Sequence, residues 1–127
     1  TLGTTPSQEY TILFRLAEQY LIRAEARAHL GNIPGAQADL NKIRHRAGLS
    51  NTTADTPESL LKAIAMERRS ELFTEQGHRW FDLKRTNTAE DVLSPIKSGW
   101  KNTDLLLPIP QAELLLNKNL LPQNPGY

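Results

Sequence analysis

The amino-acid sequence predicts an all-α fold made of a helical hairpin, a third long helix and an irregular, extended C-terminal tail. Three segments repeat apolar residues at three- and four-residue steps, which is the period of an amphipathic helix. Glycine or proline marks the boundaries between these segments. Prolines interrupt the last third of the chain, where the helical period fades. With 127 residues, we expect one domain over residues 1–127.

The hairpin is predicted over residues 10–48. Its first helix runs from about Tyr10 to Leu30, and the inward stripe of this helix consists of Leu13, Leu16, Ala17, Tyr20, Leu21, Ala24 and Ala28. Gly31 ends this helix, because glycine adopts the left-handed conformation at low cost. Pro34 lies in the first turn of the second helix, which Gly48 ends.

This hairpin resembles a tetratricopeptide unit, with small Ala24 at the helix crossing, Gly31 at the turn, and Ala36 beyond it. That repeat usually has an aromatic residue three positions after the Ala24 position, where this chain has Arg27. A single unit of this kind leaves one of its faces uncovered. We therefore expect the hairpin to pack on the later helix or on neighbours outside this chain.

A third helix is predicted from about Pro57 to Glu75 or Gln76. Thr56 supplies an N-cap before Pro57, and Gly77 supplies the stop. Residues 79–84 form a short continuation, so the third segment spans residues 56–85. The tail, residues 86–127, wraps the bundle and contains a short turn at 89–93 and a short helix at 111–116.

The third helix carries charge on its apolar face. At about 100° per residue, Arg68 and Glu71 fall within the arc of apolar residues. A buried charge costs several kcal/mol unless it is paired. We therefore expect partners after Gly77, and the candidates are Arg79, Asp82 and Arg85. A structural ion-pair network is favoured over an acid/base or anion-binding site.

Other chemistries have weaker support. Glu67 and Glu71 have the spacing of a carboxylate pair on one helical face, but neighbouring arginines favour neutralisation over hydrolysis. The histidines are widely spaced, and the chain has no cysteine and no glycine-rich phosphate loop. No catalytic residue, metal site or cofactor is therefore predicted. The net charge of +1 gives no field that would attract nucleic acid or a membrane surface.

The two tryptophans, Trp80 and Trp100, can stack on the C–H faces of sugar rings. Trp80 lies between Arg79 and Phe81 in a charged motif, so core packing is favoured for it. Trp100 lies in an irregular segment, Ser98-Gly99-Trp100-Lys101, and is the one candidate ligand-binding residue.

Three motifs carry a resemblance to a known family. The first joins Glu67-Arg68-Arg69-Ser70-Glu71-Leu72 to Gly77-His78-Arg79-Trp80-Phe81-Asp82-Leu83-Lys84-Arg85. The others are Pro108-Ile109-Pro110 and the closing Asn124-Pro125-Gly126-Tyr127. In this order they resemble the SusD/RagB family of outer-membrane glycan-binding lipoproteins. The structural signature of the resemblance consists of Glu67, Arg68, Glu71, Arg79, Trp80, Asp82 and Arg85.

The resemblance implies an α-rich lipoprotein, built partly on tetratricopeptide-like helix pairs, on the outer face of the outer membrane. Such proteins bind glycans or other nutrients without hydrolysing them and deliver them to a TonB-dependent, SusC-like transporter. Family members are several times longer and lipidated at an N-terminal cysteine, so this chain is expected to be a C-terminal part without the lipid anchor. The alternative is a tetratricopeptide-like adaptor that binds a peptide in the groove of the 10–48 hairpin.

Overall fold

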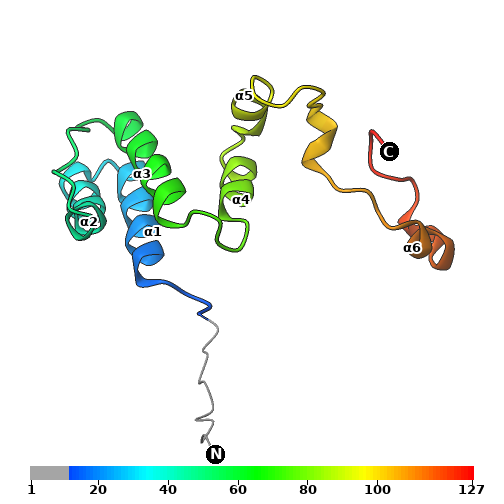
Figure 1. Ribbon diagram of the computed structural model, residues 1–127, viewed down its shortest axis with the longest axis horizontal. Coiled ribbons are helices and arrows are strands. Elements are labelled where there is room, and N and C mark those ends of the chain that lie inside the picture. The colour runs from blue at the N-terminus through cyan, green and yellow to red at the C-terminus, as the bar shows by residue number, and fades with distance from the viewer. Residues whose placement is uncertain (1–11) are drawn as a thin grey trace, which may run out of the picture. The chain divides into compact units, whose positions relative to one another are not determined.

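The computed structural model describes residues 12–127 and is helical, with no strand among these residues (Figure 1). The chain forms two compact units, Thr1–Phe73 and Thr74–Tyr127. The all-α fold class is therefore confirmed. The boundary between the units lies inside the segment 56–85 that the sequence suggested as one piece. That residues 1–127 act as one domain of a longer protein stays a prediction, as does the wrapping of the tail around the bundle.

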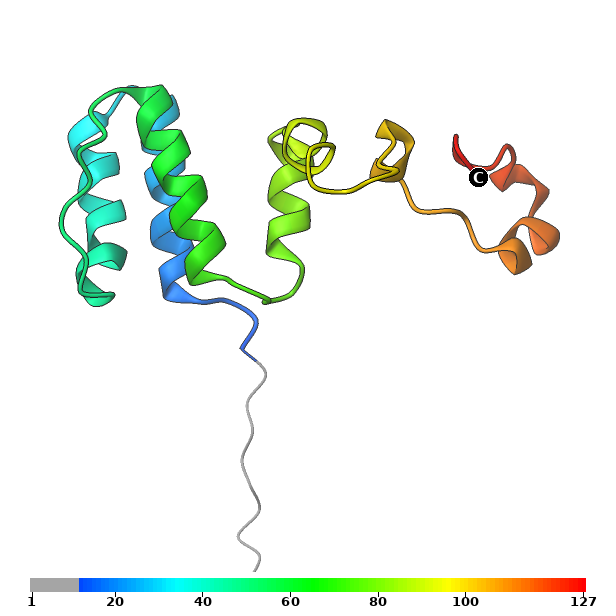
Figure 2. The ribbon, with the colours of Figure 1, turned by 45° about the horizontal axis from the view of Figure 1, so that its top comes forward.

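The first unit contains helices α1 (Leu16–His29), α2 (Ile33–Arg46) and α3 (Pro57–Glu71), which lie side by side (Figures 1 and 2). The turn between α1 and α2 uses Gly31 at φ +72° and Asn32, whose side chain accepts a hydrogen bond from the Gly35 amide at 3.0 Å. At α3, Thr56 and Ser59 cap each other reciprocally. The predicted hairpin and third helix are confirmed.

The first helix begins later than the sequence suggested. Residues 12–15 are not helical, and Arg15 at the N-cap has the extended conformation. Leu13 and Leu16, expected on the inward stripe, are exposed, and Ala17 is the first buried residue within residues 12–127. The predicted start near Tyr10 is therefore wrong, because in the described part of the chain the stripe meets the other helices only from Ala17 onward. Tyr10 itself lies outside the described residues.

The third helix ends earlier than predicted. It stops at Glu71, because Thr74 and Gln76 have φ values of +60° and +41°, which a right-handed helix excludes. Gly77, at φ +73°, is therefore the N-cap of the next helix and not the end of α3. These positive φ values fall on polar residues that carry no strong turn signal in the sequence.

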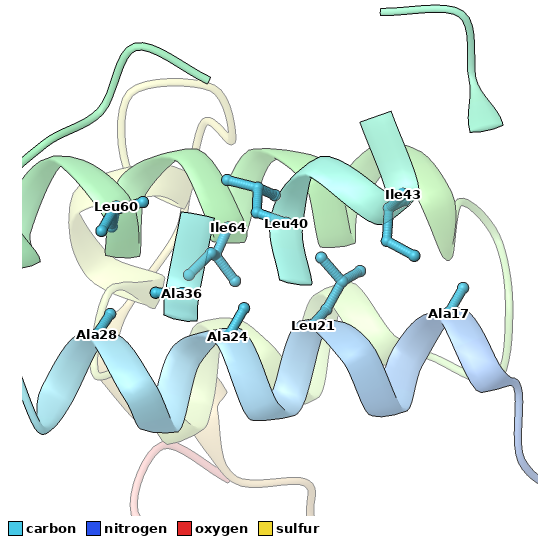
Figure 3. Packing of buried hydrophobic residues seen from close by; sticks show 9 residues of the cluster. All are labelled: Ala17, Leu21, Ala24, Ala28, Ala36, Leu40, Ile43, Leu60 and Ile64. Carbon is cyan, nitrogen blue, oxygen red and sulfur yellow. The ribbon is translucent and has the colours of Figure 1, made fainter. Parts of the chain in front are cut away.

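The core of the first unit lies between the three helices (Figure 3). The small side chains of Ala24 and Ala28 on α1 let the other helices approach closely, and Leu21 and Leu40 fill the space beside them. From α3, Leu60 and Ile64 are almost completely buried in the same cluster. As expected for a single hairpin, the later helix thus covers its open face.

The second unit contains α4 (His78–Arg85), α5 (Ala89–Leu93), α6 (Gln111–Leu116) and two 3₁₀ turns, Asn102–Leu105 and Lys118–Leu120. The predicted continuation after Gly77 and the short elements at 89–93 and 111–116 are confirmed. Between them the chain is irregular, as prolines and glycines require. Over residues 12–127 no helix is both long and apolar enough to cross a membrane.

Two motifs of the tail contact each other. The carboxamide of Gln123 donates to the Ile109 carbonyl and accepts from the Ile109 amide, both at 2.8 Å. Asn124 Nδ2 donates to the Leu107 carbonyl at 2.7 Å, and the Tyr127 hydroxyl donates to the Leu106 carbonyl at 3.0 Å. The closing Asn-Pro-Gly-Tyr motif therefore pairs with the backbone around Pro108-Ile109-Pro110 through side-chain hydrogen bonds.

Gly126 is required where it stands. Its φ is +99°, and a Cβ atom there would lie 2.7 Å from Thr103 Oγ1 and 2.8 Å from Thr103 Cβ. Gly99 has a similar φ of +87°, but a Cβ atom at Gly99 would meet nothing within 4 Å. Alanine substitutions at these two positions can therefore be compared, because both strain the backbone but only the one at Gly126 also causes a steric overlap.

We predict that Gly126→Ala opens the tail and that Gly99→Ala does so much less. Both variants place alanine at positive φ, which costs about 1 kcal/mol, but only Gly126→Ala adds the overlap with Thr103. Hydrogen exchange of the Ile109 amide is expected to be at least about tenfold faster in Gly126→Ala than in Gly99→Ala, a difference of about 1.4 kcal/mol in opening free energy. Equal exchange rates in the two variants would contradict the overlap.

Candidate functional site

The carboxylate of Glu71, at the end of α3, joins all three helices of the first unit. One oxygen accepts a hydrogen bond from Arg15 Nη2 and the other from Arg46 Nη2. Arg15 Nη1 also donates to the backbone carbonyl of Glu71 at 2.9 Å. The Glu71 side chain is only 10% exposed. The last turn of α3 is thereby tied to the N-cap of α1 and to the last turn of α2.

A second set of ion pairs lies one helical turn earlier on α3, at Glu67 and Arg68. Glu67 Oε2 accepts from Arg44 Nη1 of α2 at 3.1 Å. Arg68, with a buried side chain, places Nη2 3.5 Å from Glu18 Oε1 of α1. Together with the Glu71 contacts these pairs form what we call the ion network, which consists of Arg15, Glu18, Arg44, Arg46, Glu67, Arg68 and Glu71.

The ion network corrects one prediction. The partners of Glu71 were expected after Gly77, at Arg79, Asp82 or Arg85, but the structure supplies them from Arg15 and Arg46. The reason is geometric, because the arc of α3 that carries these charges also carries Leu60 and Ile64 and so faces α1 and α2. In α4, Asp82 accepts from Arg85 Nε at 2.9 Å, and Arg79 is exposed.

The network has the chemistry of a structural ion cluster. Glu67 is paired with Arg44, and Glu71 is paired with both Arg15 and Arg46, so both carboxylates are engaged in ion pairs between helices. Among residues 12–127 no group of three His, Cys, Asp or Glu side chains is arranged to hold a metal ion. The geometry favours a role in positioning helices over a role in acid/base chemistry.

A buried carboxylate in the hairpin was not anticipated. Asp39 of α2 is 3% exposed and accepts two hydrogen bonds from Arg23, at 2.8 and 2.7 Å, and one from Arg27 Nη1 at 2.7 Å. The hydrogen bonds and charge of Asp39 raise the pKa of Arg23. Arg27, which stands where a tetratricopeptide unit has an aromatic residue, also donates to the Gly35 carbonyl at 3.2 Å. The sequence signal for this site was the pair Arg23 and Arg27, which lie one helical turn apart on one face of α1 and can bind the same carboxylate.

The two tryptophans of the chain lie together in the second unit. The rings of Trp80 and Trp100 meet edge to face, with centroids 6.3 Å apart and planes at 77°. Trp100 Nε1 donates to Glu90 Oε2 at 2.6 Å, and Lys84 Nζ lies over the Trp80 ring, 5.5 Å from its centroid. Trp80, expected in the core, is only half-buried.

Both rings line a pocket of about 370 Å³ in the second unit, and the other lining residues are Lys97, Ser98, Gly99, Asp104 and Leu107. The sequence analysis predicted Trp100 as a ligand-binding residue but did not identify Asp104 in the pocket or Glu90, the hydrogen-bond partner of Trp100. Glu90 and Asp104 lie in segments without a recognisable motif, so no local signal identified them. The role of Trp100 in ligand binding stays a prediction.

We predict that Glu71→Gln lowers the free energy of unfolding by about 3 kcal/mol, because it leaves Arg15 and Arg46 without their shared carboxylate. The measurement is urea denaturation followed by circular dichroism. The matched control is Glu58→Gln, which makes the same substitution at an exposed residue in the first turn of α3, and we expect it to cost less than about 1 kcal/mol. A Glu71→Gln loss below about 0.5 kcal/mol would show that the network adds no stability.

Comparison with known proteins identifies the family. The family model described as the SusD family matches residues 1–127. SusD-like protein P2 of Formosa agariphila is 34% identical over 98% of this chain. The starch-binding protein SusD of Bacteroides thetaiotaomicron is 35% identical over 91% of this chain. The chain spans 27% and 21% of the length of these two relatives.

Solved structures agree in fold. A SusD superfamily protein from Bacteroides vulgatus superposes with a TM-score of 0.77 at 29% sequence identity, over 90% of this chain and 27% of that one. A SusD-like protein from Bacteroides fragilis gives a TM-score of 0.72 at 33% identity, over 87% of this chain and 25% of that one. The family resemblance drawn from the three sequence motifs is confirmed, and the chain belongs to the SusD family.

Proposed function

We propose that this chain is the C-terminal part of a cell-surface protein that binds glycans or other nutrients without hydrolysing them. The observation that carries the proposal is the family match over residues 1–127, which includes a relative named as a starch-binding protein. In the proposal, the full-length protein is lipid-anchored on the extracellular face of the outer membrane. It delivers its ligand to a TonB-dependent, SusC-like transporter.

The ion network of the first unit supports a binding role without catalysis. Hydrolysis of a glycosidic bond uses a pair of carboxyl groups, one of which must donate a proton. Glu67 and Glu71, one turn apart, had the spacing of such a pair. Both carboxylates are instead engaged in ion pairs with Arg44, Arg15 and Arg46, which supports a role in holding the helices together.

The adaptor alternative has less support. A peptide-binding hairpin needs an open apolar face on which a partner segment can lie. On the hairpin of α1 and α2, Leu60 and Ile64 of α3 fill that face and are almost completely buried. A peptide would have to displace α3 from the core of its own unit.

The test is affinity electrophoresis of the full-length gene product in gels that contain single polysaccharides, with starch, xylan, mannan and pectin as probes. We expect at least one polysaccharide to retard migration, with no reducing sugar released during prolonged incubation with the same polymer. Bovine serum albumin in neighbouring lanes controls for non-specific retardation. Release of reducing sugar would contradict the non-catalytic role, and migration unchanged in every gel would contradict glycan binding.

A further inference from the structure

We propose that the pocket formed by Trp80 and Trp100 is a binding subsite for a neutral pyranose ring of a glycan. This inference rests on the proposed function and deepens it, because it places a ligand contact in the second unit and names the groups that make it. The stacking surfaces are the two indoles, and the hydroxyl partners are Asp104 and Ser98.

The pocket has the surface chemistry that a sugar requires. A pyranose ring presents C–H groups on its faces and hydroxyl groups around its rim, so it needs an aromatic plane with polar groups at the edge. Trp80 and Trp100 supply two such planes at 77° to each other, and Ser98 and Asp104 lie in the same pocket. A volume of about 370 Å³ is near the lower end for small-molecule sites, so the pocket fits a short saccharide.

One aromatic wall is held in place before any ligand binds. The hydrogen bond from Trp100 Nε1 to Glu90 fixes the Trp100 indole, which otherwise lies in an irregular segment. A side chain that is already ordered loses little conformational entropy when a ligand stacks on it. The hydrogen bond to Glu90 also satisfies the only polar atom of the indole, so the ring presents an apolar surface to the sugar.

Asp104 supplies an acceptor that the protein uses only in part. Its Oδ2 accepts a hydrogen bond from the Lys101 amide at 3.0 Å, which orients the carboxylate at the start of the 3₁₀ turn Asn102–Leu105. The other oxygen can accept from a sugar hydroxyl. Lys97 and Asp104 line the pocket with opposite charges, which favours a neutral sugar over an acidic or basic one.

The test is isothermal titration of the full-length gene product with four neutral trisaccharides: maltotriose, cellotriose, xylotriose and mannotriose. We expect one of them to bind, and Trp100→Ala to weaken its affinity by about tenfold or more, because a stacking plane is lost. Asp104→Asn keeps an acceptor for the Lys101 amide but removes the charge, and we expect an approximately threefold to tenfold loss.

The matched control is Phe81→Ala. Phe81 is an exposed aromatic residue that follows Trp80 in the sequence but does not line the pocket, so its removal is expected to leave the affinity within about twofold. Trp100→Phe keeps an aromatic plane without the Glu90 hydrogen bond and serves as a second, milder variant. We expect it to fold and to weaken binding less than Trp100→Ala, and circular dichroism checks the fold of every variant.

The outcomes separate the two proposals. Weaker binding in the Trp100 and Asp104 variants, with Phe81→Ala unchanged, supports the subsite. Polysaccharide retention with no trisaccharide binding, or with trisaccharide affinity unchanged in the pocket variants, overturns the subsite and leaves the proposed function in place. A full-length protein that binds neither polysaccharide nor trisaccharide overturns both.

Discussion

The structure of the first unit depends on the carboxylate of Glu71, which is shared by Arg15 and Arg46. These arginines belong to the N-cap of α1 and the last turn of α2, so one side chain of α3 ties down the N-terminal end of α1 and the C-terminal end of α2. Arg15 also binds the Glu71 carbonyl, where the negative end of the α3 dipole favours a cation. Burial of the apolar core drives the helices together, and the ion network links α3 to both α1 and α2.

The motif that identifies the family therefore has two physical roles in two compact units. Its first half, Glu67 to Glu71, supplies two of the three carboxylates of the ion network and one of its cations, Arg68. Its second half, residues 77–85, forms α4 and carries Trp80, one wall of the tryptophan pocket. The boundary between the units falls between these halves.

The sequence was most informative where the signal is local. Apolar periodicity and the cap at Thr56 indicated the three helices, and Pro110 correctly marked the start of the helix at Gln111–Leu116. The sequence was least informative where the structure depends on contacts between residues that are far apart in the chain. The helical wheel showed that Glu71 points inward but not that α1 and α2 lie on that side. Likewise, no periodicity predicts that Arg23 and Arg27 bury the carboxylate of Asp39, or that Glu90 holds Trp100.

The most direct test of the role of Glu71 is a double-mutant cycle that combines Glu71→Gln with Arg15→Met and, separately, with Arg46→Met, with stability measured in urea. We expect a coupling free energy of about 1–2 kcal/mol for the pair with Arg15. We expect a smaller coupling with Arg46, because the Arg46 side chain is 56% exposed and that of Arg15 is 31% exposed. Additive losses within about 0.3 kcal/mol for both pairs would show that Glu71 does not join the helices energetically.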